Sequence, residues 1–233
     1  MKKTLLYITI LFVAIACKPR ENTSTHLQVW LHRANSIEKA QHFQDQYSGL
    51  EIDVYYIDSL NMFLVKHDVD DTTTLTLDHW CGALDQISRL GIWFDFKNLS
   101  SLNCKSALRC LTDLRDKYEL QGMLIVESTA YDALPSFRKA GFQDSYYIPP
   151  FDPETVDSIQ YQQYVEKIQD AIISGVTHLS GYDYQYDFMK REFPEQRKLL
   201  WTLNRQAHYQ DKLIEKIGGD TLVDVLLVPN SHY

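Results

Sequence analysis

Five apolar runs in this chain each end in a charged or imidazole side chain, and this pattern constrains the fold more than any other feature. The runs lie near residues 27–32, 49–57, 62–67, 91–97 and 122–127. Apolar, β-branched and aromatic runs of this length are typical of buried strands. A carboxylate removed from water must be paired, coordinated or neutralised. The charged ends of these strands are therefore expected to meet at one site.

Helical stretches separate most of the predicted strands. Four further strands are expected near 144–148, 178–182, 198–203 and 223–228. The clearest helices cover 36–47, 74–89, 103–118, 131–140, 152–174 and 207–217. Alternation of strand and helix favours parallel pairing. If the strand near 62–67 is the second arm of a hairpin, eight strands remain, which predicts an α/β fold, a single-domain (β/α)₈ TIM barrel. An open doubly wound sheet is the rival architecture, but no GxGxxG turn supports it.

The N-terminus has the pattern of a bacterial lipoprotein signal. Two lysines precede an apolar run that is too short to span a bilayer, and small residues precede Cys17. We therefore predict a signal peptide at 1–16, lipid on Cys17, a polar tether at 17–26 and the barrel domain at 27–233. An ordinary secretory signal or a short anchor is the alternative. The mature chain of 233 − 16 = 217 residues is small for this fold, and the expected location is the bacterial cell envelope, with the lipid in a membrane.

The charge balance argues against one class of partner. The formal net charge is −8 and the sequence has no basic stripe, whereas a nucleic-acid binder needs clustered lysine and arginine. Cys81, Cys104 and Cys110 are expected to be buried thiols, and without a CxxC motif no zinc site is predicted.

The segment Glu51-Ile52-Asp53 presents two carboxylates on the same side of a strand. Two like charges this close are unfavourable unless a cation lies between them. Asp95, from the next strand of the barrel, would add a third oxygen ligand. Ligation by oxygen alone suits Mg²⁺ or Ca²⁺ better than zinc. A pair that faces the solvent is the alternative.

Two histidines and a lysine lie at neighbouring strand ends. His32 and His67 beside a metal site suggest a general base and a general acid, although a single strand-end histidine is more often structural. Lys97 faces the same side as Asp95. It either forms a structural ion pair with that carboxylate or holds a phosphate oxygen.

Three further side chains are candidates for contact with a substrate. Arg33 contacts a substrate or forms a surface salt bridge. Glu127 is a fourth metal ligand, an acceptor for Lys97 or a strand-end cap. Trp201 closes the rim of the pocket. Asp68 orients His67, fixes the turn or forms a surface salt bridge.

Three motifs resemble the HR…ExD…HD signature of the glycerophosphodiester phosphodiesterase superfamily: His32-Arg33, Glu51-x-Asp53 and His67-Asp68. The runs WTLN (201–204) and VDVLLVP (223–229) are similar to late strands of that family. The resemblance implies a metal-dependent TIM barrel that cleaves phosphodiesters, often of deacylated phospholipids.

Two branches of this superfamily share further features with the chain. Asp95-x-Lys97 resembles the sphingomyelinase D branch, in which an aspartate is the third metal ligand and a lysine meets the phosphate. The runs LDHW (77–80) and DFK (95–97) are similar to the menorin family. The chain departs from the pattern in three ways: Ala34 replaces the glycine of HRG, the usual ENT after it is reduced to Asn35-Ser36, and the interval from Asp68 to Asp95 is short. These departures leave the substrate open.

Carried over residue by residue, the resemblance implies a metal held by Glu51, Asp53 and Asp95, proton exchange by the two histidines, and a phosphate gripped by Lys97 and Arg33. The implied function is a phosphoric diester hydrolase with Mg²⁺ or Ca²⁺ that hydrolyses or cyclises a glycerophosphodiester or phospholipid headgroup. The alternative is a catalytically inactive barrel lipoprotein that binds a ligand or an envelope partner. The complete set of site residues favours the enzyme, and the altered HRA favours the binder.

Overall fold

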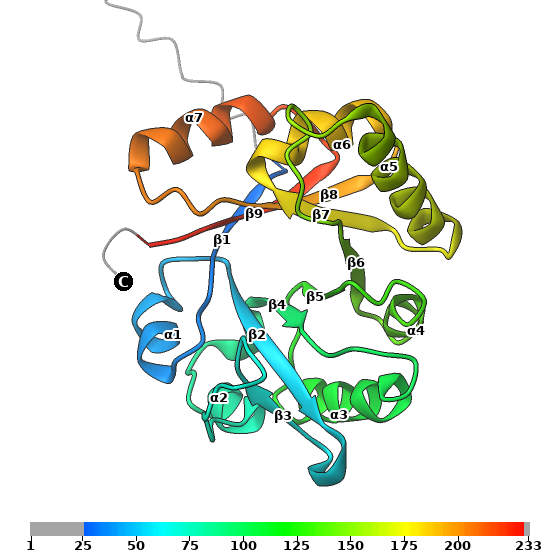
Figure 1. Cartoon of the computed structure of the whole chain (residues 1–233). Coiled ribbons are helices and arrows are strands. Elements are labelled where there is room, and N and C mark those ends of the chain that lie inside the picture. The colour runs from blue at the N-terminus through cyan, green and yellow to red at the C-terminus, as the bar shows by residue number, and fades with distance from the viewer. Residues whose placement is uncertain (1–25, 231–233) are drawn as a thin grey trace, which may run out of the picture.

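The protein is described here by a computed structural model, which covers residues 26–230. Within these residues one sheet contains nine strands, and its ends join through a pairing of β1 with β2. The strands are β1 (Gln28–Leu31), β2 (Gly49–Ile57), β3 (Met62–Val65), β4 (Gly91–Phe96), β5 (Leu124–Ser128), β6 (Gln143–Tyr147), β7 (His178–Tyr182), β8 (Arg197–Trp201) and β9 (Val223–Val228). Figure 1 shows the helices arranged around these strands.

Eight of the strands are parallel and close into a barrel in the order β1-β2-β4-β5-β6-β7-β8-β9. The remaining strand, β3, pairs antiparallel with the outer half of β2 and forms the predicted hairpin. The single-domain (β/α)₈ barrel is therefore confirmed. The carboxyl ends of all eight parallel strands lie at one end of the barrel, here called the mouth, and their amino ends lie at the other, here called the base.

Seven helices lie outside the barrel in the described part of the chain. They are α1 (Ile37–Phe43), α2 (Leu77–Gly82), α3 (Cys104–Lys117), α4 (Leu134–Lys139), α5 (Ser158–Ile173), α6 (Tyr186–Glu192) and α7 (Ala207–Ile217). The predicted helix at 74–89 is wrong in extent, because the Thr76 side chain caps its start and Gly82 ends it, after which a 3₁₀ turn covers Ile87–Arg89. Helix α6 was not predicted, because its aromatic start has weak helix propensity.

Two apolar clusters hold the fold together. The larger cluster lies between the outside of the barrel and the helices, and the smaller one fills the barrel itself. Near the base, the indole of Trp30 occupies the space that side chains at Gly49 and Gly91 would need. These two glycines therefore let a large ring close the floor of the barrel beneath the pocket at its mouth.

The N-terminal predictions lie almost entirely outside the described residues. The signal peptide, the lipid on Cys17 and the tether, with its last residue His26 excepted, are in this category and stay predictions, as does the envelope location. Between residues 26 and 230, no helix is both long and apolar enough to cross a membrane. Cys81, Cys104 and Cys110 are free thiols, as expected. Cys81 is buried, but Cys104 and Cys110 are only partly buried, so the prediction of burial is wrong for these two.

Candidate active site

Nine predicted site residues line one pocket at the mouth of the barrel. They are His32, Arg33, Glu51, Asp53, His67, Asp95, Lys97, Glu127 and Trp201. The pocket has a volume of about 90 Å³. Alternate residues of a strand point to the same side, so ExD on β2 and DxK at the end of β4 bring four charged groups into it. The tenth predicted site residue, Cys17, lies outside the described residues.

The turn after β1 holds the carboxylate of Glu51. Arg33 has a left-handed backbone with φ of 57°, which residues other than glycine rarely adopt. In this conformation its N–H donates a hydrogen bond to Oε2 of Glu51 at 2.6 Å. The next residue, Ala34, is fully buried, and its carbonyl accepts a hydrogen bond from Nε1 of Trp80 at 2.8 Å. An alanine is thus accommodated where the family signature has glycine.

The same turn also holds Asp53, through a residue whose role the sequence did not reveal. Nδ2 of Asn35 donates to Oδ2 of Asp53 at 2.5 Å, and the N–H of Asp53 donates to Oδ1 of Asn35 at 2.9 Å. Asn35 therefore contacts the backbone and the carboxylate of one residue at once. The departure from ENT to Asn35-Ser36 was visible in the sequence, but this pairing across two segments was not.

Lys97 bridges two of the carboxylates. Its Nζ lies 2.7 Å from Oδ1 of Asp53 and 2.5 Å from Oδ2 of Asp95. Burial lowers the pKa of Lys97, but the two aspartates raise it more, so the ammonium stays charged. Both interpretations of Lys97 remain compatible with this geometry: an ion pair with Asp95, and a charge beside the pocket that a phosphate can reach.

The acidic side chains of the site are buried and lie close together, and both conditions shift their pKa values. Burial, and then the nearby Asp53 and Asp95, raise the pKa of Glu51 well above its usual value. Burial also raises the pKa of Asp53, but Lys97 and Asn35 more than offset this, and its pKa lies below the usual value. Burial also raises the pKa of Asp95. Without a further cation, Glu51 and Asp95 are therefore both driven toward their neutral forms.

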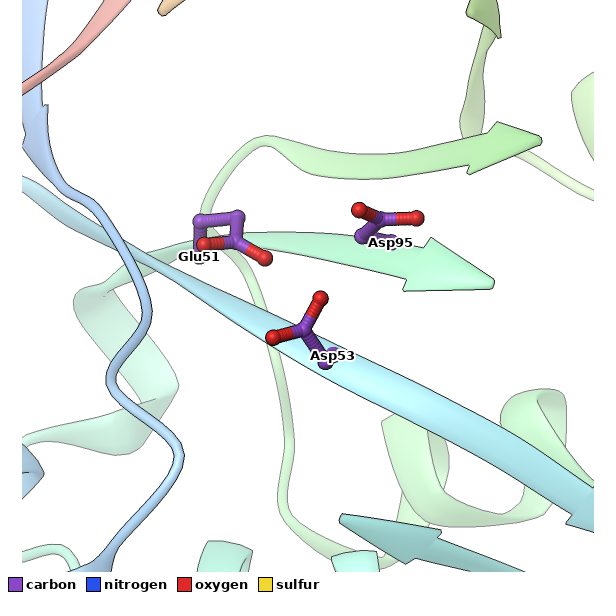
Figure 2. Close-up of side chains that lie close together, drawn as sticks. All are labelled: Glu51, Asp53 and Asp95. Carbon is purple, nitrogen blue, oxygen red and sulfur yellow. The ribbon is translucent and has the colours of Figure 1, made fainter. Parts of the chain in front are cut away.

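The three predicted ligands fit a hard divalent cation. Glu51, Asp53 and Asp95 each offer one oxygen, and these oxygens lie within 4.8 Å of one another. Figure 2 shows the three carboxylates gathered over β2 and near the end of β4. Glu51 is only 2% exposed, yet its Oε1 has no hydrogen-bond partner. Buried polar atoms are rarely left unpaired, and a bound cation would satisfy this one.

The two histidines lie at the pocket in different environments. Burial, and then the charge of Arg33, lower the pKa of His32 to about 3, so its imidazole is neutral at pH 7. His67 is partly exposed, and its Nδ1 lies 2.9 Å from Oδ1 of Asp68. Asp71 accepts hydrogen bonds from the N–H groups of His67 and Asp68 and fixes this turn. Asp68 thus pairs with the ring of His67 at the surface of the pocket, a contact that fits both an orienting role and a surface salt bridge.

Aromatic side chains and one buried acid form the part of the pocket away from the carboxylates of β2. Trp201 packs against Tyr147 and Tyr182, with ring centroids 4.9 and 5.2 Å apart, and both tyrosines line the pocket. Glu127 is 2% exposed, and its pKa is raised well above the usual value by burial and then by Asp95. Glu127 is therefore a buried acid facing the pocket, rather than a strand-end cap.

Three residues outside the predicted set complete the description of the pocket lining. Asn204 does not line the pocket; its side chain accepts the N–H of Gln206 before helix α7. Trp93 and Tyr147 line the pocket although the sequence analysis did not select them. Their inward alternation on β4 and β6 was the available signal.

No protein-family model matches this sequence, and no curated protein matches it. Solved structures do share its fold. A glycerophosphodiester phosphodiesterase from Parabacteroides distasonis is 18% identical, with a TM-score of 0.60 over 88% of this chain and 93% of that one. A phosphodiesterase from Oleispira antarctica, in complex with the product sn-glycerol-3-phosphate, is 15% identical, with a TM-score of 0.58 over 86% and 92%.

A more distant structural neighbour is a calcium-dependent phosphoinositol-specific phospholipase C from a Pseudomonas species. It is 11% identical, with a TM-score of 0.51 over 86% of this chain and 88% of that one. The chain therefore has the fold of the glycerophosphodiester phosphodiesterase and phospholipase C-like barrels, which confirms at the level of fold the resemblance predicted from its motifs.

Proposed function

We propose that this chain is a metal-dependent phosphodiesterase that acts on a glycerophosphodiester or a phospholipid headgroup. The observation that carries the proposal is the convergence of two imidazoles, three carboxylates and a lysine on one pocket at the mouth of a barrel. Structural neighbours with the same fold include phosphodiesterases, one of them with sn-glycerol-3-phosphate as its product.

The residues divide the work of phosphodiester cleavage. Glu51, Asp53 and Asp95 would hold Mg²⁺ or Ca²⁺, which when bound polarises the phosphoryl group as a Lewis acid. Lys97 stabilises negative charge that develops on the phosphoryl oxygens. The two histidines exchange a proton, with one accepting it from the attacking hydroxyl and the other returning one to the leaving oxygen.

Proton transfer depends on the environment of each imidazole. The lowered pKa of His32 keeps its imidazole neutral, so it has an acceptor nitrogen without first losing a proton, but it also makes the ring a weak base. Asp68 accepts a hydrogen bond from Nδ1 of His67 and stabilises that ring when it is charged. The attacking hydroxyl belongs to water or to the substrate itself, and the second case gives a cyclic phosphate.

The test is turnover of two phosphodiesters by the purified chain, glycerophosphocholine and bis-p-nitrophenyl phosphate. We expect turnover with Mg²⁺ or Ca²⁺, complete loss with EDTA, and recovery when excess metal is restored. Metal binding by calorimetry with no turnover of any phosphodiester offered would instead support a barrel that binds a ligand without catalysis. Turnover that EDTA leaves unchanged would contradict the metal-dependent mechanism.

A further inference from the structure

In each of two proposed metal ligands, the turn after β1 occupies one carboxylate oxygen with a hydrogen bond. On Glu51, Oε2 accepts the N–H of Arg33 at 2.6 Å, whereas Oε1 is buried with no partner. On Asp53, Oδ2 accepts Nδ2 of Asn35 at 2.5 Å, whereas Oδ1 faces the ammonium of Lys97. The turn formed by residues 32–35 therefore engages one oxygen of each carboxylate; the other is unpartnered on Glu51 and is paired with Lys97 on Asp53.

This arrangement bears on the identity of the metal. Ca²⁺ accepts six to eight oxygens and often takes both oxygens of a carboxylate, in a flexible geometry. Mg²⁺ is smaller, requires near-octahedral geometry, and is usually held by one oxygen from each of one or two carboxylates with waters completing the shell. Carboxylates restricted to a single oxygen thus suit the smaller ion.

The restriction on Asp53 is the stronger of the two, because one side chain imposes it at two points. Asn35 accepts the backbone N–H of Asp53 and donates to its carboxylate, so the carboxylate cannot rotate to present both oxygens without losing a hydrogen bond. Asp53 is 1% exposed, so losing that bond would leave a buried polar atom unpaired, which is costly. Figure 2 shows its carboxylate beside that of Glu51 at the site.

We propose that Asn35 is a positioning residue that makes this site selective for Mg²⁺ over Ca²⁺, by confining Asp53 to a single-oxygen contact. The inference rests on the proposed function, since it concerns the metal of the same site. It also separates this chain from the structural neighbour described as calcium-dependent.

The experiment is calorimetric titration of the metal-free full chain with Mg²⁺ and with Ca²⁺, without substrate. For the wild type we expect tighter binding of Mg²⁺. Asn35→Ala frees the second oxygen of Asp53, so Mg²⁺ affinity should fall, by about 10-fold or more as for other partners of metal ligands, while Ca²⁺ affinity falls less or rises. The measured quantity is the ratio of the two dissociation constants.

Asn98 offers a matched control, because it contacts the same strand as Asn35. Asn98 also makes a two-point contact with β2, accepting the N–H of Tyr56 at 2.9 Å and donating to its carbonyl at 2.9 Å, but it touches no carboxylate. Asn98→Ala should lower thermal stability and leave the Mg²⁺ to Ca²⁺ ratio unchanged. If Asn35→Ala acted only by weakening the fold, both variants would change the thermal stability and the Mg²⁺ to Ca²⁺ ratio in the same way.

Three results would overturn the proposal, and they are distinguishable. Tighter binding of Ca²⁺ by the wild type refutes the selectivity and needs no variant. An unchanged ratio in folded Asn35→Ala refutes the role of Asn35 and leaves the metal site standing. If neither ion binds the wild type, the metal site is wrong, and the metal-dependent function fails with it.

Discussion

At the base of the barrel, Asp224 on β9 is buried among three partners. Its carboxylate accepts hydrogen bonds from Arg197 and lies 2.5 Å from Nε2 of His26 and 3.4 Å from Nε2 of His178. At the mouth, Glu51 on β2 is just as buried, but its Oε1 has no partner and its nearest charged neighbours include two aspartates. Both acids lie at strand ends of one barrel, and their surroundings are opposite.

The pKa shifts of the two acids follow from this difference. Burial raises the pKa of Asp224, but hydrogen bonds from His178, Arg197 and His26 outweigh burial and bring it well below the usual value. Burial and like charges raise the pKa of Glu51. The base therefore stabilises an ionised carboxylate with the chain's own groups, whereas the mouth leaves a carboxylate to be completed by something else. An end built for stability and an end built for binding differ in this respect.

The largest effect should separate a histidine at the mouth from one at the base. His32→Ala removes an imidazole from the pocket and should lower turnover by about 10²–10⁴-fold, the usual contribution of general acid–base catalysis. His178→Ala, at the start of β7, should leave turnover per folded molecule unchanged. The measurement is the initial rate with a saturating metal ion. Full activity in His32→Ala would remove that residue from the mechanism.

A second comparison exchanges the two acids for their amides. Asp224→Asn leaves the cationic Arg197 with a weakened partner and should lower the free energy of unfolding by about 2 kcal/mol, less than for a fully buried pair because Arg197 is partly exposed. Glu51→Gln in the metal-free protein should change it little, because that carboxyl is already driven toward its neutral form. Urea denaturation of both variants without metal is the measurement.

The outcome that would contradict this comparison is a larger loss of stability in Glu51→Gln than in Asp224→Asn.

The pH dependence of the free energy of unfolding gives a further check on Asp224. A carboxylate whose folded-state pKa is depressed contributes stability above its unfolded pKa of about 3.9. That contribution is lost as the pH falls through the lower folded value, so the difference between wild type and Asp224→Asn should shrink in acid.

The sequence predicted the barrel because its evidence is local. Each strand can be recognised from a short apolar run in the sequence, and the alternation of strands with helices is compatible with few sheet topologies. The same locality explains why Glu51, Asp53, Asp95 and Lys97 were found together. Parallel strands have their carboxyl ends at one rim, so residues at those ends converge whatever the exact register.

The features that were missed depend on contacts between distant segments. Asn35 contacts Asp53 only because the turn after β1 lies against β2, and nothing in either segment reveals the pairing. His178 and Asp224 lie 46 residues apart in sequence, on strands separated by β8. Helix α2 is short because a threonine caps its start and a glycine ends it. The prediction of a helix across 74–89 followed the amphipathic pattern and gave these two signals too little weight.

The smallest effect concerns the pH dependence of metal binding, and it sharpens the contrast at the mouth. The raised pKa of Glu51 means that part of the metal-free protein carries a proton on this carboxyl, which must leave before the oxygen can bind a cation. Metal affinity should therefore rise with pH up to that raised pKa, by at most about tenfold per pH unit, because one proton is released. Titrations at three pH values, in buffers of different ionisation enthalpy, measure both the affinity and the protons released.

Glu51→Gln should bind metal more weakly and lose this pH dependence. Proton release that persists in that variant would assign the titrating group to another residue, and pH-independent binding by the wild type would show that Glu51 is ionised before the metal arrives.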